Sequence, residues 1–200
     1  MGRFVYWMNV SLDLLIEHRA DEDGGGDWLR IDERLHREFN KRADRLTVLV
    51  QGRRIFEIME DFWPAASEDP TMPEHVREYG RIWMTKPKIL VSDTRTTNAP
   101  NTTTIGGSDT IGRLQALREQ TQGDIGVGGA TLATHLLEAR LLDELLLFTH
   151  PSILGSGRPL FDRSIDPIEL ELIEQARYGQ VTLHRYAVRS ALPCKQPPTD

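Results

Sequence analysis

The sequence predicts an α/β protein in which a mainly parallel sheet lies between two layers of helices. Short apolar runs alternate along the chain with segments of helical periodicity, which is typical of three-layer αβα folds. The runs Phe4–Asn9 and Leu46–Val50 lack clean polar–apolar alternation, as expected of strands that are covered on both faces. Two late β-prone runs, Ile168–Ile173 and Val181–Val188, predict an antiparallel strand pair at one edge of the sheet.

Composition excludes several classes of function. The 200 residues are 39% hydrophobic and 27% charged, which suits one globular domain over residues 1–188 and a flexible, proline-containing tail over 189–200. The formal net charge of −6 leaves no basic excess for binding nucleic acid phosphates. No apolar run reaches membrane-spanning length, and the single cysteine, Cys194, excludes an internal disulfide and a cysteine-rich metal site. We therefore expect a cytoplasmic protein without a metal, and with neither nucleic acid nor membrane as a partner.

The remaining elements follow from local patterns. A helix is expected over Ile31–Ala43, with Leu35 and Phe39 continuing the apolar stripe that begins at Ile31. The loop before it, Asp21–Asp27, contains three consecutive glycines and is either a solvated surface loop or a lid over a site. Further helices are expected around Ile55–Met59, over Glu74–Trp83 and over Asp109–Gln120. Further strands are expected over Lys88–Ser92 and Leu145–Thr149, and loops over Pro64–Pro73 and Asn98–Thr104.

One stretch, from Asp124 to Ala139, organises the rest of the chain. It contains a short apolar run, three glycines at positions 126, 128 and 129, and then Leu132 and Leu136 at helical spacing. Glycines at a strand–helix junction let the backbone turn sharply and let a ligand approach it closely. The free N–H groups at the start of the following helix suit a phosphate. The pattern is not a full dinucleotide fingerprint, so a purely structural turn is the alternative.

Four junctions suited to a ligand follow predicted strands. They are Asn9–Asp13, Gly52-Arg53, Ser92–Arg95 and Gly126–Thr131. Because ligands of parallel sheets bind outside the carboxyl ends of the strands, we expect all four junctions at one edge. This convergence favours a binding function over an inert scaffold.

Six motifs carry a resemblance to a known family. They are Ser11-Leu12-Asp13, Gly52-Arg53-Arg54-x-Phe56-Glu57, Phe62-Trp63-Pro64, Lys86-Pro87-Lys88-Ile89-Leu90-Val91-Ser92, Gly128-Gly129-Ala130-Thr131-Leu132, and Leu142-Asp143-Glu144-Leu145 followed by Pro151 and Gly155–Phe161. From Phe4 to about Val188 the chain resembles the dihydrofolate-reductase-like superfamily. The closest branch is the reductase domain of bacterial riboflavin biosynthesis, which is the C-terminal domain of a bifunctional deaminase–reductase, together with its stand-alone relatives.

The resemblance implies an activity and a cofactor. It implies hydride transfer from a nicotinamide cofactor, usually NADPH, to a small heterocyclic or ribosylaminopyrimidine-like substrate, without a metal. It also implies contacts with each part of the cofactor. Gly52, Arg53 and Arg54 would lie beside the pyrophosphate and the adenosine half, and Ser92 near the ribose 2′-phosphate. The pyrophosphate would be surrounded by Gly128, Gly129, Ala130 and Thr131, while Ser11 and Asp13 belong to the loop beside the nicotinamide and the substrate. To these contacts we add Gly126, from the same glycine-rich turn.

One departure from the family pattern concerns the cofactor. Family members often carry Arg or Lys directly after the serine matched by Ser92, whereas this chain has Asp93. A carboxylate there repels a 2′-phosphate and accepts hydrogen bonds from a ribose 2′-hydroxyl. NADH is therefore possible in place of NADPH, unless Arg54 or Arg95 compensates.

Two further departures argue against the riboflavin step itself. Leu14 stands where the family pattern Ser-Leu-Asp-Gly has its glycine. Val127 stands where the riboflavin-pathway enzymes commonly carry Glu before the paired glycines.

The predicted proton donor is a carboxylate early in the chain. Dihydrofolate reductases place one in the first turn of the helix after the first loop, a few residues beyond a tryptophan. Here Trp28 is followed by Asp32 and Glu33, whose side chains diverge by about 100° around a helix axis, so only one faces the cleft. Asp32 is favoured as the donor because it lies beside Leu35. Glu33 is preferred if the family's spacing from tryptophan to acid holds strictly, and Asp13 is the rival donor. Stabilising the helix dipole is the alternative role for Asp32 and Glu33.

Three other residues are candidates for substrate contacts: Asn9, Trp28 and His36. The alternative for His36 is a surface or half-buried position without a role in binding. One core face needs fewer apolar residues than the four leucines Leu141, Leu142, Leu145 and Leu147. Related reductases are commonly dimers, so we expect a homodimer. The alternative function is a non-catalytic nucleotide-binding relative of the same fold. A hydrolase is not expected, because the chain lacks a Gly-x-Ser-x-Gly elbow.

Overall fold

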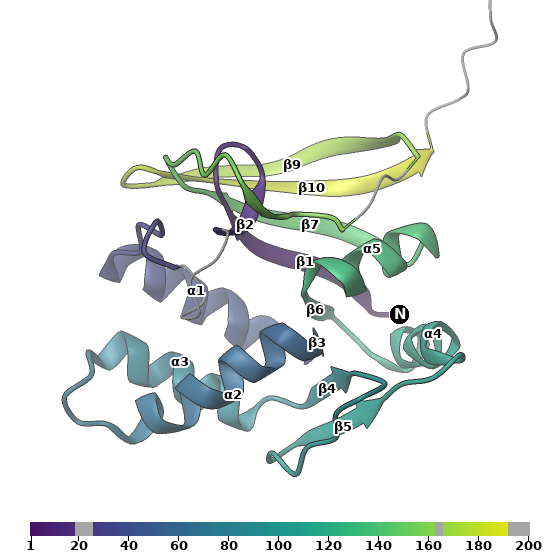
Figure 1. Ribbon diagram of the computed structural model, residues 1–200, viewed down its shortest axis with the longest axis horizontal. Coiled ribbons are helices and arrows are strands. Elements are labelled where there is room, and N and C mark those ends of the chain that lie inside the picture. The colour runs from purple at the N-terminus through teal and green to yellow at the C-terminus, as the bar shows by residue number, and fades with distance from the viewer. Residues whose placement is uncertain (19–25, 163–165, 192–200) are drawn as a thin grey trace, which may run out of the picture.

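The computed structural model of the protein describes residues 1–18, 26–162 and 166–191. Its middle layer is an eight-stranded sheet with the order β5-β4-β3-β6-β1-β7-β10-β9 (Figure 1). The strands from β5 to β7 in this order run parallel, and β10 and β9 complete the sheet in antiparallel orientation. The bounds are β1 Arg3–Val10, β3 Val48–Gly52, β4 Lys88–Val91, β5 Thr102–Ile105, β6 Asp124–Gly128, β7 Leu142–Thr149, β9 Ile168–Tyr178 and β10 Val181–Ala191.

Helices cover both faces of this sheet, which confirms the predicted three-layer architecture. On one face, Leu35, Phe56 and Trp83 from α1, α2 and α3 are buried against the strands. On the other face, Leu114 of α4 and Leu136 of α5 belong to the largest core cluster. The helices are α1 Glu33–Arg45, α2 Arg53–Glu68, α3 Glu74–Thr85, α4 Thr110–Gln120 and α5 Ala130–Glu138. Among the described residues, no helix is long and apolar enough to cross a membrane.

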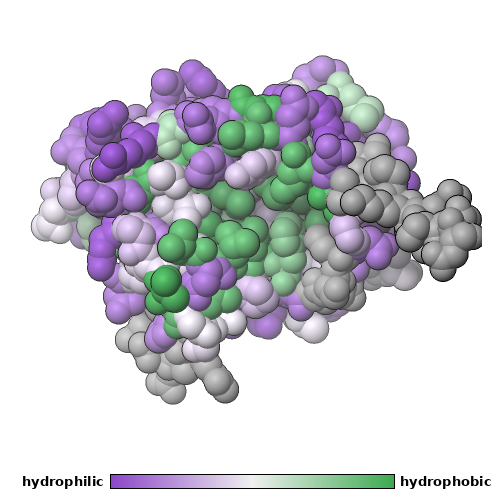
Figure 2. Space-filling view, turned by 90° about the horizontal axis from the view of Figure 1, so that it is seen from above, coloured by the Kyte–Doolittle hydropathy of each residue, from purple (hydrophilic) through white to green (hydrophobic). Residues whose placement is uncertain are grey.

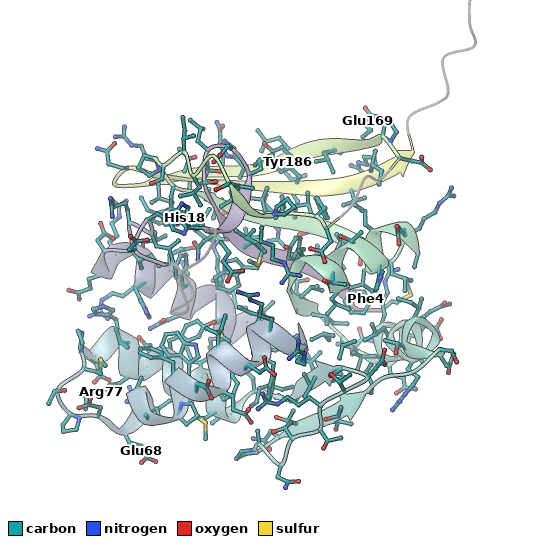
Figure 3. All side chains as sticks on the ribbon, in the orientation of Figure 1. Phe4, His18, Glu68, Arg77, Glu169 and Tyr186 are labelled. Atoms are coloured by element: carbon teal, nitrogen blue, oxygen red, sulfur yellow. The ribbon has the colours of Figure 1, made fainter. Side chains whose placement is uncertain are left out.

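Strand β1 illustrates how the two cores form. Phe4 and Tyr6 pack into the cluster below α4 and α5, whereas Val5 and Trp7 face the cluster of α1. Figure 3 places Phe4 beside α5 in the interior, while Glu169 at the start of β9 points outward. Because successive side chains of a strand point to opposite faces, a strand between two helix layers must be apolar throughout.

Two loop predictions were wrong at one end each. Residues 64–68 of the predicted loop Pro64–Pro73 continue α2, although proline lacks the N–H that a helix interior uses. Packing of the neighbouring Trp63 against Tyr79 of α3, with ring centroids 4.3 Å apart, holds this last part of α2 in place. The end of the predicted loop Asn98–Thr104 instead forms β5, where β-branched threonines pair with β4 at the sheet edge.

Other boundaries also differ from the prediction. Ile31 precedes α1 and is exposed, so the buried stripe of that helix begins at Leu35. The predicted tail begins too early, because β10 continues to Ala191, while residues 192–200 lie outside the described residues. Most of the predicted glycine-rich loop also lies outside them, since residues 19–25 are not described.

A small second sheet was not predicted. It consists of β2 Leu15–His18 and β8 Gly157–Pro159, which pair in antiparallel orientation. It brings the segment after β1 together with a segment more than a hundred residues later in the chain. The four leucines that suggested a partner, Leu141, Leu142, Leu145 and Leu147, are all buried in the core of the chain itself.

Candidate active site

A cavity of about 910 Å³ lies at the carboxyl ends of β3, β4 and β6. The starts of α2 and α5 form its floor, the loop after β4 and the start of α4 form one wall, and the β2–β8 sheet contributes another. Of the predicted cofactor residues, the following line it: Gly52, Arg53, Arg54, Ser92, Gly129, Ala130 and Thr131. Three of the four predicted junctions therefore share this cavity, as the parallel sheet topology requires.

The turn at Gly129 brings two helix starts together. Gly129 is the N-cap of α5 and has a φ of 105°, a conformation that side chains other than glycine rarely adopt. A Cβ added to it would lie 3.8 Å from the backbone N and Cα of Gly52, which is the N-cap of α2. In the described part of the chain, neither cap is satisfied by a side-chain hydrogen bond. The open N–H groups and the positive ends of two helix dipoles thus point toward one place, which favours an anion.

Arginine side chains surround these helix starts. Arg54 forms an ion pair with Glu17 of β2, and both residues line the cavity. Arg158 of β8 donates a hydrogen bond from Nη2 to Thr131 Oγ1 at 2.9 Å and forms an ion pair with Asp162. Neither Arg158 nor Glu17 is among the predicted site residues, because only the pairing of β2 with β8 brings them to the cavity.

Asn9 and Trp28, predicted to contact substrate, lie together in a second cluster beside the ends of β1 and β7. Its centre is His150, which is completely buried. His150 Nδ1 accepts a hydrogen bond from the backbone N of Arg30 at 2.9 Å, so its Nε2 carries the proton that bonds Asn9 Oδ1 at 3.1 Å. Burial and the charge of Arg30 lower the pKa of His150 to about 4, which keeps the ring neutral.

Trp28 packs edge-on against His150, with ring centroids 5.4 Å apart. Its Nε1 is buried, and no acceptor for it is found among the described residues. A buried donor without a partner is rare in folded proteins and commonly meets water or a ligand. The third residue predicted to contact substrate, His36, lies elsewhere. It packs between α1 and α3, against His75 and Tyr79.

The three predicted acids lie outside the lining of the cavity, as far as the described residues define it. Asp13 accepts hydrogen bonds from Ser11 Oγ at 2.6 Å and from the backbone N of Gly155 at 2.8 Å, and these bonds lower its pKa to about 2. Glu33 is exposed, and its hydrogen bond with Arg37 lowers its pKa. Asp32 is the N-cap of α1, with Oδ1 accepting from the backbone N of Leu35 at 2.8 Å.

Four predicted cofactor residues do not line the cavity. Ser11 is buried and bonds the loop of Asp13, while Gly128 packs next to Ile55. A Cβ on Gly126 would come within 2.7 Å of Leu46, so this glycine serves close packing in the middle of β6. The fourth, Arg95, is held by two carboxylates of α2.

Comparisons with known proteins identify the family of the chain. The family model of the RibD C-terminal domain matches residues 7–183. The chain belongs to the RibD C-terminal domain family. A relative in Bacillus subtilis (strain 168), the uncharacterized protein YyaP, is 29% identical over 179 residues, which cover 88% of this chain and 89% of that protein.

Two solved structures show the fold of this RibD C-terminal domain protein. A putative riboflavin biosynthesis protein from Shewanella sp. PV-4 is similar with a TM-score of 0.67 and 22% identity, over 94% of this chain and 99% of that chain. Dihydrofolate reductase from Enterococcus faecalis, in a complex with NADP(H), is similar with a TM-score of 0.60 and 15% identity, over 94% and 97% of the two chains. The protein therefore has the dihydrofolate-reductase-like fold, as its sequence motifs predict.

Proposed function

We propose that this protein is a reductase that transfers a hydride from NADPH or NADH to a small heterocyclic substrate, and that it works in the cytoplasm. The observation that carries the proposal is the meeting of two helix starts at Gly52 and Gly129 on the cavity floor. A pyrophosphate is a doubly charged anion, and two uncapped helix N-termini suit it. Family membership and the fold support the same activity.

The chain would hold the dinucleotide in an extended form along the cavity. Gly129 and Thr131 would contact the pyrophosphate from the start of α5, and Arg54 from the start of α2. The adenosine half would lie toward Ser92, and the nicotinamide toward Met8 and Ile16 at the apolar end. When bound, the cofactor supplies the hydride, while the protein orients it and excludes water.

Asp32 stays our proposal for the proton source. Hydrogen bonds lower the pKa values of Asp13 and Glu33 and so disfavour the protonated form that a donor needs. Asp32 follows the segment of Trp28 and Arg30, which is anchored to His150 at the end of β7. In the chain, Asp32 is thus two residues beyond Arg30, whose backbone N bonds His150 in the cluster that we propose for the substrate.

The class of substrate follows from the resemblance and from the second cluster. A planar heterocycle could stack beside Trp28 and accept a hydrogen bond from its buried Nε1. Pterins, ribosylaminopyrimidines and flavins all carry suitable acceptor atoms. The alternative function, nucleotide binding without catalysis, is favoured by one observation: within the described residues, the predicted acids do not line the cavity.

Two measurements test the proposal. Tryptophan-to-nicotinamide energy transfer on adding NADPH or NADH tests binding, because the chain contains four tryptophans. Cofactor oxidation against a panel of pterins, ribosylaminopyrimidines and flavins then tests catalysis. We expect binding and oxidation with at least one substrate class. Binding without oxidation across the whole panel would favour the non-catalytic alternative, and the absence of binding would refute both.

A further inference from the structure

The carboxylate of Asp93 has a fixed position in the wall of the cavity. Its Oδ1 accepts a hydrogen bond from the backbone N of Gly107 at 2.6 Å, and Asp93 lines the cavity. The loop that carries it is also held, because Ser92 Oγ accepts from the backbone N of Thr94 and of Arg95 at 3.2 and 3.0 Å. The carboxylate is therefore held by the N–H of Gly107, on a loop that the Ser92 hydroxyl also holds.

The opposing loop packs closely against this carboxylate. A Cβ on Gly106 would come within 2.4 Å of the carbonyl oxygen of Ser92 and within 2.8 Å of Asp93 Oδ1. These are shorter than real Cβ contacts, so the loop after β4 and the loop after β5 fit together only with glycine at this position. Asp93 therefore lies where the two loops meet.

The nearby arginines are committed to other partners. Arg95 Nη1 lies 2.8 Å from Glu57 Oε1, its Nη2 bonds Glu60, and it does not line the cavity. Arg54 pairs with Glu17. Arg53 has a longer contact than Arg54 or Arg95, since its Nη1 is 3.4 Å from Glu57, and its side chain is 56% exposed.

These contacts determine which ribose the wall accepts. A 2′-phosphate carries close to two negative charges at neutral pH, and beside a fixed carboxylate it is repelled. A 2′-hydroxyl can instead donate a hydrogen bond to the carboxylate. Acidic residues at strand ends accept the same bond in NAD-binding sheets. Arg53 is largely exposed, and an exposed cation offsets this repulsion only weakly.

We propose that Asp93 selects NADH over NADPH. The inference rests on the proposed function, because it assumes that the cavity holds a nicotinamide dinucleotide. It deepens that function by assigning cofactor choice to one side chain, and it differs from the NADPH preference that the family resemblance implies.

The test is direct binding of NADH and of NADPH to the full chain, without substrate, for the parent and for Asp93→Asn. Asparagine keeps the size of the side chain and an oxygen for the N–H of Gly107, so the loop should stay folded. We expect the parent to bind NADH at least ten times more tightly than NADPH, and the variant to lower this ratio at least ten-fold, mainly by binding NADPH better. Asp93→Ser is a second variant with the same expectation, and Asp44→Asn, which changes an exposed carboxylate at the end of α1, should leave the ratio unchanged.

Two results would overturn the inference while leaving the proposed function intact. The first is tighter binding of NADPH than of NADH by the parent. The second is a ratio that changes less than two-fold in both Asp93 variants. Binding of neither dinucleotide to the parent would instead overturn the proposed function, and this inference with it.

Discussion

The carboxylate of Glu17 on β2 forms an ion pair with the guanidinium of Arg54 at the start of α2, and both residues line the cavity. Because β2 also pairs with β8, the same wall includes Arg158, which bonds Thr131 at the start of α5. One short sheet thus joins the two helix starts that we propose for the pyrophosphate. This arrangement makes the charged wall of the site depend on long-range pairing.

The proton source can be tested with Asp32→Asn. Asparagine caps a helix about as well as aspartate, so the free energy of unfolding should change by only a few tenths of a kcal/mol. If Asp32 donates the proton, turnover should fall by a factor of about 10² to 10⁴ while cofactor affinity stays the same. Glu33→Gln, which changes the adjacent exposed carboxylate, is the matched control and should retain turnover. Parent-like turnover in Asp32→Asn would remove this assignment.

His150 predicts a specific dependence of stability on pH. Its pKa is lowered from 6.5 to about 4 in the folded protein, so the unfolded chain binds more protons between these values. The free energy of unfolding should therefore fall as the pH is lowered from about 6.5 to about 4, by up to about 3 kcal/mol from this residue.

Urea unfolding over this pH range measures the effect of His150. In His150→Gln the free energy of unfolding should fall less steeply as the pH is lowered, whatever the loss of stability at neutral pH. In His135→Gln, which removes an exposed imidazole on α5, the slope should match the parent. An equal slope in the parent and in His150→Gln would mean that His150 does not stay neutral in the folded protein.

Leu14 predicts a stabilising substitution. Its φ is 58°, a left-handed conformation that is strained for leucine, and it is half exposed. The family pattern places glycine there, so Leu14→Gly should raise the free energy of unfolding by about 0.5–1 kcal/mol. Leu12→Gly, at an exposed neighbour without a positive φ, should not stabilise the protein. Thermal unfolding of both variants decides this, and a lower midpoint for Leu14→Gly would contradict the expectation.

The homodimer stays a prediction, but on different residues from those the sequence indicated. Viewed onto the β9–β10 side, apolar side chains gather on one face (Figure 2), and Leu170, Leu172 and Ile173 of β9 are exposed. β9 is an edge strand, and the N–H and C=O groups along its free edge can pair with a second copy of this chain. A second copy of this chain is therefore the partner that we expect on β9.

Light scattering tests this assembly. The parent should show twice the 22.8 kDa mass of one chain at micromolar concentration, and Leu172→Asp should shift it to a single chain. Leu12→Asp, which changes an exposed leucine on another loop, should remain a dimer. A parent with the mass of one chain would refute the prediction.

Features that depend on neighbouring residues could be predicted from the sequence. The glycine turn before α5 and the ligand-suited ends of β3 and β4 are local patterns, and parallel topology then brings them to one edge. The helical continuation through Pro64 could not be predicted, because it depends on contact between Trp63 and α3. The same holds for the pairing of Arg158 with Glu17 and for the bond between Asn9 and His150, which both join positions more than a hundred residues apart.

Gly129 offers the most direct test of the central claim that two helix starts hold a dinucleotide. Calorimetric titration should show that Gly129→Ala binds NADH and NADPH at least ten-fold more weakly than the parent, because a left-handed alanine distorts the start of α5. Gly155→Ala is the matched control, since Gly155 also has a positive φ (71°) but does not line the cavity, and its cofactor affinity should change less than two-fold. Equal affinities in the parent and both folded variants would contradict the claim.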